Sequence, residues 1–407
     1  PDELRAVFEL AVQALTDEGD YANAVRAATA YGKVAVGHRD REKRAETNTA
    51  WAAALKANPA HAPDAAAKFR AAAEDYQALA DAHPTGSGKA DYLRRAAVQL
   101  RLAGDDAGAL TAIDRITKTA GVPEDAVAAA YLDKGEALLA RNDFTQGVSA
   151  LQQAMAVAAP AAAPARVRLA TAYLEAARTA AKAGDPQAKG QADFAVKLLA
   201  QVADAAADGA TEKAAQQQAL FELGLVLLQR GNLPDAEARF RKLVQAHPTG
   251  PIAGQGRLYL GSCLLLLARG DHQGGRPPVD AARKLEEAAK VFEGLSASDD
   301  PVLRTQADLR TVDTLLLQQK YDDMPTVCDK LAAKYAGAVE ELIVLSRLYL
   351  AYRMADRPEP AARVMARMEE LYGKLPDSQF RGGLDEYTRD YWQKQWFAAA
   401  KPPAAKE

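Results

Sequence analysis

The apolar positions of the chain recur with the period of an α-helix, most clearly over residues 217–250. In the first half of this segment the apolar residues are spaced i, i+3, i+4 and i+7, which is typical of one buried helix face. The sequence Gly-Asn-Leu-Pro follows at 231–234. Gly is common just after the end of a helix, and Pro is common at the first position of the next helix. A second apolar face ends before Pro248. The pattern predicts a helical hairpin whose main apolar positions are Leu220, Leu223, Leu227, Ala236, Phe240 and Leu243.

Units of the same kind recur along the chain at a spacing close to about 34 residues. The pentapeptide Ala-His-Pro-Thr-Gly occurs unchanged at 82–86 and at 246–250, each time where a second helix is expected to end. One hairpin buries too little of its own apolar face to be stable alone, so such units stack on one another. We expect an array of about nine hairpins over residues 1–375, with insertions near 58–63, 184–192 and 270–280.

The order Leu-Gly, turn, Ala236, Phe240 and Pro248 resembles the tetratricopeptide repeat (TPR), although Leu220 replaces that family's early Trp. The resemblance implies an all-α fold, a right-handed superhelical solenoid of antiparallel helix pairs. The repeated ending Ala-His-Pro-Thr-Gly is similar to the TPR subclass of the bacterial cell envelope. That likeness implies an extracytoplasmic scaffold, with the periplasm or envelope as its location and the cytoplasm as the alternative.

Aromatic residues crowd the segment that follows the last predicted hairpin. Tyr387 and Tyr391, like Trp392 and Trp396, are four residues apart, so a helix places each pair on one stripe. We expect a capping helix over 377–398 that covers the last apolar face of the array. The alternative is self-association or contact with a partner, because aromatic side chains anchor interfaces. The polar, Pro-containing residues 399–407 are predicted to form a disordered tail.

Composition and charge narrow the function classes. The formal net charge is -3, so the chain lacks the basic surplus of a general nucleic-acid-binding protein. No run of 18 apolar residues occurs, and no transmembrane helix is predicted. Aromatic residues make up 6% of the chain and β-branched residues rarely alternate with polar ones, which disfavours a β fold. Cys263 and Cys328 fall in apolar helical segments without CxxC spacing, and we interpret both as inert buried residues.

The sequence carries no recognisable catalytic pattern. A catalytic site needs a nucleophile with a base, a set of metal ligands or a phosphate cradle, and the chain has no GxGxxG, GxxxxGK[ST] or HExxH motif. His83 and His247 occupy the same place in the repeated pentapeptide, which indicates a structural role. Asp271-His272 lies in a Gly-rich insertion that we interpret as a surface loop. We therefore predict no enzymatic activity, no cofactor and no bound metal ion.

Recognition of another protein is the remaining function class. In TPR proteins the first helix of each hairpin lines a concave groove, so the resemblance implies a protein- or peptide-binding scaffold or adaptor. The alternative function is an auxiliary or regulatory segment of a larger envelope machine or enzyme. It also remains open whether the apolar residues line a groove or are buried by neighbouring helices. The candidate groove residues are Arg94, Arg101, Phe221, Leu225, Leu228, Leu258, Ser262, Leu309, Asp313 and Leu316, with Val98, Leu265 and Ser346 beside them.

Overall fold

The computed structural model describes residues 2–31, 39–250, 252–270, 279–380 and 387–397. Within these ranges the secondary structure consists of α-helices α1 to α19, short 3-10 turns and one π-helical turn, and no strand occurs in them. The fold is an all-α solenoid of helical hairpins, as the hydrophobic pattern predicts.

The chain divides into two compact units, Pro1–Ala219 and Leu220–Glu407, and the boundary lies inside helix α11. Each unit is built from short helices that follow one another directly. In the first unit these are α1 (Asp2–Asp17), α2 (Tyr21–Tyr31), α3 (Arg39–Lys56), α4 (Ala62–Ala82), α5 (Gly86–Leu102), α6 (Asp106–Lys118), α7 (Glu124–Ala140), α8 (Phe144–Val157), α9 (Ala159–Lys182) and α10 (Gln187–Asp204). Helix α11 (Ala210–Gln229) spans the boundary. The helices of the second unit after it are α12 (Leu233–Ala246), α13 (Ala253–Arg269), α14 (Ala281–Ser296), α15 (Pro301–Leu317), α16 (Met324–Lys334), α17 (Val339–Met354), α18 (Pro358–Lys374) and α19 (Arg389–Trp392).

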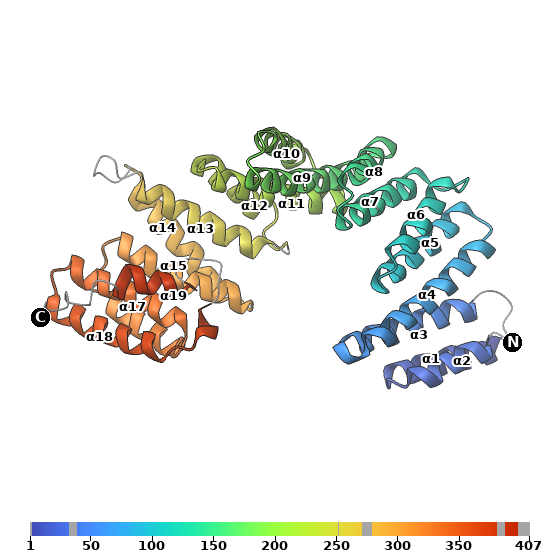
Figure 1. The fold of residues 1–407 in the computed structure, drawn as a ribbon, viewed down its shortest axis with the longest axis horizontal. Helices are drawn as coiled ribbons and strands as arrows, with labels where there is room; N and C mark the ends of the chain where they lie inside the picture. Colours follow the sequence, from blue (N-terminus) through green and yellow to red (C-terminus); the bar gives the residue numbers. More distant parts are fainter. Residues whose placement is uncertain (1, 32–38, 251, 271–278, 381–386, 398–407) are drawn as a thin grey trace, which may run out of the picture. The chain divides into compact units, whose positions relative to one another are not determined.

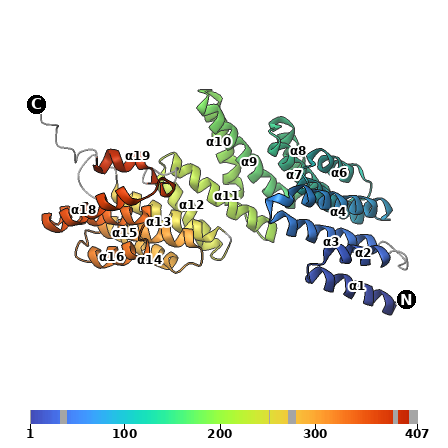
Figure 2. The same ribbon diagram turned by 60° about the horizontal axis from the view of Figure 1, so that its bottom comes forward.

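Helices that are consecutive in the chain pack as pairs, among them α3 with α4, α7 with α8, α9 with α10, α13 with α14 and α17 with α18 (Figure 1, Figure 2). The first helices of successive hairpins also contact one another, as α5 does with α7, α7 with α9, α13 with α15, and α15 with α17. Each hairpin therefore buries its apolar stripes partly against its own partner helix and partly against the next hairpin.

The turns inside the hairpins share one backbone conformation. The second residue after the first helix takes a positive φ at Gly19, Gly104, Gly184 and Gly231, which lets the preceding helix end in a left-handed cap. An Asp then commonly caps the second helix. Asp105 is an example, since its carboxylate accepts a hydrogen bond from the N–H of Gly108 at 2.8 Å. The same left-handed place is taken by non-Gly residues in three other turns, at Asn142, Gln319 and Asp356.

Gln319 is the least suited of these residues to its conformation, and we expect Gln319→Gly to stabilise the second unit. Gln319 has a φ of 59°, and a left-handed residue with a Cβ costs about 1 kcal/mol relative to Gly. Its neighbour Gln318 is right-handed, with a φ of -72°, so Gln318→Gly is a matched control that should lower stability by roughly 0.5–1 kcal/mol. Urea unfolding followed by circular dichroism measures both changes. Equal destabilisation by the two variants would contradict the assigned strain.

Glycines on first helices lie directly against aromatic rings of the second helices. A Cβ added to Gly224 would lie 2.7 Å from the Phe240 ring, and one added to Gly261 would lie 2.5 Å from the Phe292 ring. The two Gly–Phe contacts are equivalent although the insertion at 270–280 lengthens the chain between Gly261 and Phe292. Phe240 and Phe292 are both fully buried. Close approach of paired helices therefore depends on Gly at these two places.

The stretches expected to be insertions differ in structure. The stretch 58–63 contains a 3-10 turn, Pro59–His61, before α4 begins. In the stretch 184–192 the connection is short, because α10 already begins at Gln187. The Asp185 carboxylate accepts a hydrogen bond from the Gln187 N–H at 2.8 Å. Residues 271–278 of the third insertion, including Asp271 and His272, lie outside the described residues.

The C-terminal segment is less regular than the single helix expected over 377–398. It contains a 3-10 turn (Asp377–Gln379), the short helix α19 and a π-helical turn (Gln393–Phe397); residues 381–386 and 398–407 lie outside the described ranges. Thr388 is the N-cap of α19, and its side chain accepts a hydrogen bond from the Tyr391 N–H at 3.2 Å. The segment nevertheless packs its aromatic side chains onto the core of α17 and α18.

Candidate functional site

The candidate residues lie on one side of the first helices. On α5, α11, α13 and α15 they are spaced i, i+4 and i+7, so the three residues of each helix share a face. We call this set the first-helix face; α5 carries its part in the first unit, and α11, α13 and α15 carry its part in the second. It consists of Arg94, Val98 and Arg101 on α5, Phe221, Leu225 and Leu228 on α11, Leu258, Ser262 and Leu265 on α13, and Leu309, Asp313 and Leu316 on α15.

Some residues of the first-helix face are covered by neighbouring helices. Phe221 is buried against the rings of Phe240 and Tyr259, with centroids 6.1 and 5.7 Å away. Leu265 and Leu309 are also buried. Ser346 of α17 is fully buried and donates its hydroxyl to the carbonyl of Ile343 at 2.7 Å. These side chains belong to the core of the second unit and offer no surface to a ligand.

Other residues of the same face reach solvent. Leu225, Leu228, Leu258 and Leu316 are half-buried, and Val98 is 48% exposed. Two apolar residues outside the predicted set extend these stripes: Leu102 and Leu266 are each 42% exposed. Leu266 lies eight residues after Leu258, and Leu102 eight after Arg94, so continuing the helical spacing by one step would have found both.

Two charged residues of the first-helix face, Arg94 and Asp313, are paired with the next hairpin, whereas Arg101 on α5 is exposed. Arg94 on α5 lies 2.8 Å from a carboxylate oxygen of Asp133 on α7. Asp313 on α15 accepts from Arg310 at 2.9 Å and from Arg347 on α17 at 2.9 Å. Because these charges already have partners, a ligand at this face would gain little from either of them.

Such ion pairs link first helices in both units. Glu9 lies 3.5 Å from Arg39, joining α1 to α3, and Glu136 lies 2.7 Å from Arg168, joining α7 to α9. Asp313 and Arg347 are 34 residues apart in the chain, as are Asp81 and Arg115, which join two second helices. Opposite charges separated by one repeat period are the sequence signal that would have indicated these pairs.

The cysteine and histidine side chains have structural rather than chemical roles. Burial raises the pKa of the Cys263 and Cys328 thiols to about 12, so neither is a reactive thiolate near neutral pH. His83 ends α4 and His247 ends α12, and the His83 ring accepts from the N–H of Thr85 at 3.3 Å. Within the described ranges no three His, Cys, Asp or Glu side chains are grouped to hold a metal ion, and none of the helices described there is long and apolar enough to cross a membrane.

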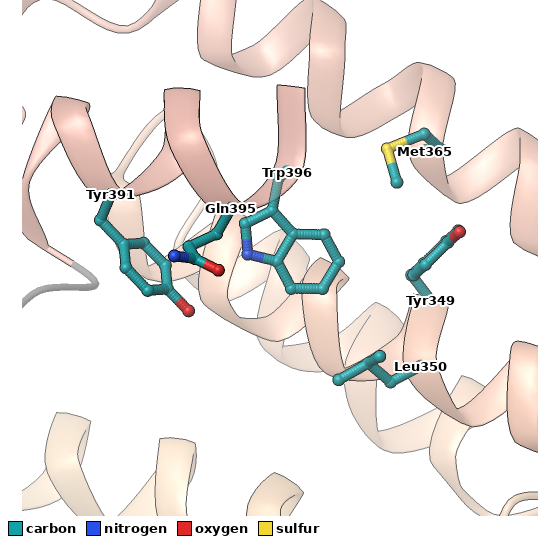
Figure 3. A pocket seen from close by; sticks show the side chains of 6 residues that line it. All are labelled: Tyr349, Leu350, Met365, Tyr391, Gln395 and Trp396. Carbon is teal, nitrogen blue, oxygen red and sulfur yellow. The ribbon is translucent and has the colours of Figure 1, made fainter. Parts of the chain in front are cut away.

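A pocket opens between the C-terminal segment and the last hairpin (Figure 3). It has a volume of about 370 Å³ and is partly open to solvent. Tyr391, Gln395 and Trp396 of the C-terminal segment form one wall, and residues of α17 and α18 form the other. The Trp396 ring meets Tyr349 edge to face, with centroids 5.8 Å apart. The lining is thus mainly aromatic and aliphatic; its members are Tyr349, Leu350, Met365, Tyr391, Gln395 and Trp396.

Arg389 and Trp392 hold the wall of this pocket in place. The Arg389 guanidinium stacks over Phe380 and Tyr372, 4.4 and 5.0 Å from the ring centroids, and lies 2.7 Å from a carboxylate oxygen of Asp377. Trp392 is fully buried in the core of α15 to α18. Its neighbours Tyr391 and Trp396 are thereby directed toward the pocket.

No protein-family model matches the sequence, and none of the curated proteins matches it. Solved structures with a similar chain path include the apo form of the quorum sensor NprR from B. thuringiensis (12% identity, 91% of this chain and 99% of that chain, TM-score 0.39). A human IFIT1 dimer with PPP-AAAA has 13% identity, covers 86% of this chain and 69% of that chain, and has a TM-score of 0.38. A tetratricopeptide repeat protein from Parabacteroides merdae ATCC 43184 has 13% identity, covers 69% of this chain and 93% of that chain, and has a TM-score of 0.34.

Proposed function

We propose that the chain is a non-catalytic scaffold or adaptor that binds a protein or peptide on its first-helix face. The observation that carries this proposal is the exposed apolar surface of α13 in the second unit, where Leu266 is 42% exposed; Val98 and Leu102 on α5 of the first unit are exposed in the same way. Apolar side chains exposed together on one unit are typical of a protein-interaction site. Leu258, half-buried on α13, extends the same stripe and adds apolar contact area.

The chemistry of the face favours an apolar ligand. Arg94 and Asp313 are engaged in ion pairs between hairpins, so the exposed part of the face on the second unit is mostly Leu, while α5 of the first unit adds Val98, Leu102 and the exposed Arg101. An amphipathic helix or an extended apolar peptide supplies the complementary surface, with anchor residues at the spacing of the exposed leucines. Recognition then depends on apolar burial more than on charge, and we expect it to depend only weakly on salt.

Leu266→Glu tests this proposal, and we expect the variant to lose the bound partner. A charge placed in a desolvated apolar contact weakens binding by about 2–4 kcal/mol, which is more than thirtyfold in affinity. Leu266 is already 42% exposed, so the substitution leaves the packing of α13 intact. The measurement is affinity capture from native lysate, with the captured proteins identified and then titrated as purified proteins against each variant.

Phe194→Glu is the matched control for this experiment. Phe194 is 41% exposed, as large and as apolar, but it belongs to the second helix of its hairpin, α10. We expect this variant to retain the partners that Leu266→Glu loses. Retention of every partner by Leu266→Glu, or equal loss from both variants, would remove the first-helix face as the binding site. Leu309→Glu is unsuitable here because Leu309 is buried.

The proposal includes a family and a setting. Nine consecutive helical hairpins, α1–α2 to α17–α18, with a C-terminal cap are the domain organisation that we propose for a TPR-family protein. The pentapeptide at 82–86 and at 246–250 ends a second helix in both places, α4 and α12. Its likeness to envelope TPR proteins supports an envelope scaffold. Cell fractionation with an antibody to the chain tests the setting, and recovery in the cytoplasmic fraction alone would exclude it.

A further inference from the structure

We propose that the C-terminal pocket binds a proline pair, and that its occupant is Pro402-Pro403 of the same chain. The pocket is a site separate from the first-helix face, and this proposal does not depend on the function proposed above. It rests on the chemistry of the six lining residues, on the position of the pocket at the end of the described chain, and on the sequence that follows.

The lining residues suit a proline-rich segment. Proline rings dock against aromatic faces, and the polyproline II backbone keeps its carbonyl groups unbonded within the helix. Tyr349, Tyr391 and Trp396 supply the aromatic surface, with Leu350 and Met365 beside them (Figure 3). The Gln395 amide and the Tyr391 hydroxyl are donors for the ligand carbonyls. None of the six lining residues is charged, which suits an uncharged proline pair.

The chain itself supplies such a segment next to the pocket. The described part ends at Phe397, one residue after Trp396, which forms part of the pocket wall. Residues 398–407 lie outside the described ranges, and their sequence is Ala-Ala-Ala-Lys-Pro-Pro-Ala-Ala-Lys-Glu. The segment from Trp396 to Pro402 reaches at most about 20 Å, which is ample for a return to the wall from which it departs.

A short connection gives this intramolecular contact an advantage over any separate peptide. A ligand tethered by a short flexible linker has an effective concentration of about 1 mM. A proline pair that binds with a dissociation constant of about 0.1 mM therefore occupies the pocket most of the time. A free proline-rich peptide has to compete with the chain's own segment, and removal of the two prolines should open the pocket.

The experiment uses the full chain and a synthetic peptide of residues 398–407 as the probe, with tryptophan fluorescence as the signal. We expect the Pro402→Ala/Pro403→Ala chain to bind the probe about tenfold more tightly than the unaltered chain does, because the competing segment is removed. Trp396→Phe should abolish the signal, which assigns it to the pocket. A chain with Ala404→Ser/Ala405→Ser is the matched control and should behave like the unaltered chain.

Three results would overturn the proposal. The first is equal affinity of the unaltered and proline-lacking chains for the probe, and the second is no binding by the proline-lacking chain. The third is loss of self-association, measured by analytical ultracentrifugation, when the prolines are replaced, since this would place the segment of a second copy in the pocket. A probe with both prolines replaced by Ala should not bind. Gln395→Ala, which changes an exposed lining residue, should weaken probe binding to the proline-lacking chain several-fold.

Discussion

Phe240→Ala is expected to lower the free energy of unfolding of the second unit by about 3–5 kcal/mol, because it removes a fully buried ring. Phe240 lies at the meeting point of three helices. Its ring stacks on Tyr259 of α13 with centroids 5.4 Å apart and an interplanar angle of 15°, and it covers Gly224 of α11. Gly has no side chain to fill the space, so the cavity left by Ala persists. Urea unfolding monitored by circular dichroism measures the loss.

Phe194→Ala is the control for the Phe240 experiment. Phe194 also belongs to a second helix and also contacts an aromatic residue, Tyr173, at a centroid distance of 4.9 Å. It is 41% exposed, however, so its truncation leaves no closed cavity. We expect a loss of about 1 kcal/mol or less for Phe194→Ala. Equal losses for the two variants would show that the Gly–Phe contact is not a main source of stability.

Trp392→Ala is expected to release the C-terminal segment and to reduce stability by about 3–5 kcal/mol. Trp392 is fully buried and belongs to the same apolar core as Leu345, Leu348 and Met368 of the last hairpin. The segment that carries it has only one short helix and one π-helical turn, so local backbone hydrogen bonds stabilise it little. Hydrogen exchange of residues 387–397 should become much faster in the variant.

Lys394→Ala is the control for Trp392→Ala. Lys394 lies on the same turn, exposed, and its Nζ lies 2.8 Å from Asp390, an ion pair of the kind worth less than about 1 kcal/mol. We expect its exchange rates and unfolding to remain near those of the unaltered chain. If Trp392→Ala leaves the protection of residues 387–397 unchanged, Arg389 and the aromatic rings around it are sufficient to hold the segment.

The hairpins were predictable from local sequence because their signals lie within a few residues of one another. The apolar spacing around Leu220 and Leu223, the Gly231 turn and Pro234 are enough to define two helices and their joint. The expected insertion near 184–192 is a short turn after Gly184, since Gln187 already begins α10. The C-terminal helix was overextended for a similar reason: i, i+4 aromatic pairs do not show where a helix is interrupted.

The candidate site was less predictable than the hairpins. The helical spacing predicted that both Leu225 and Leu309 line the groove. In the structure Leu225 is half-buried and Leu309 is buried. Arg94 and Asp313 were predicted to line the groove, while the structure pairs each with a residue on the next first helix. Whether a side chain is covered depends on its neighbour one repeat away, which local periodicity does not describe.

The sequence alone determined the all-α class, the hairpin as the structural unit and the places of its turns. These features follow from propensity, spacing and turn chemistry, which act between residues that are close in the chain. Only the tertiary structure decided which apolar residues remain exposed, which charges are paired and where a pocket forms. Tyr349 and Trp396 meet across that pocket because α17, α18 and the C-terminal segment share one core. Contacts between residues so far apart in the chain depend on the packing of whole helices, which no local pattern encodes.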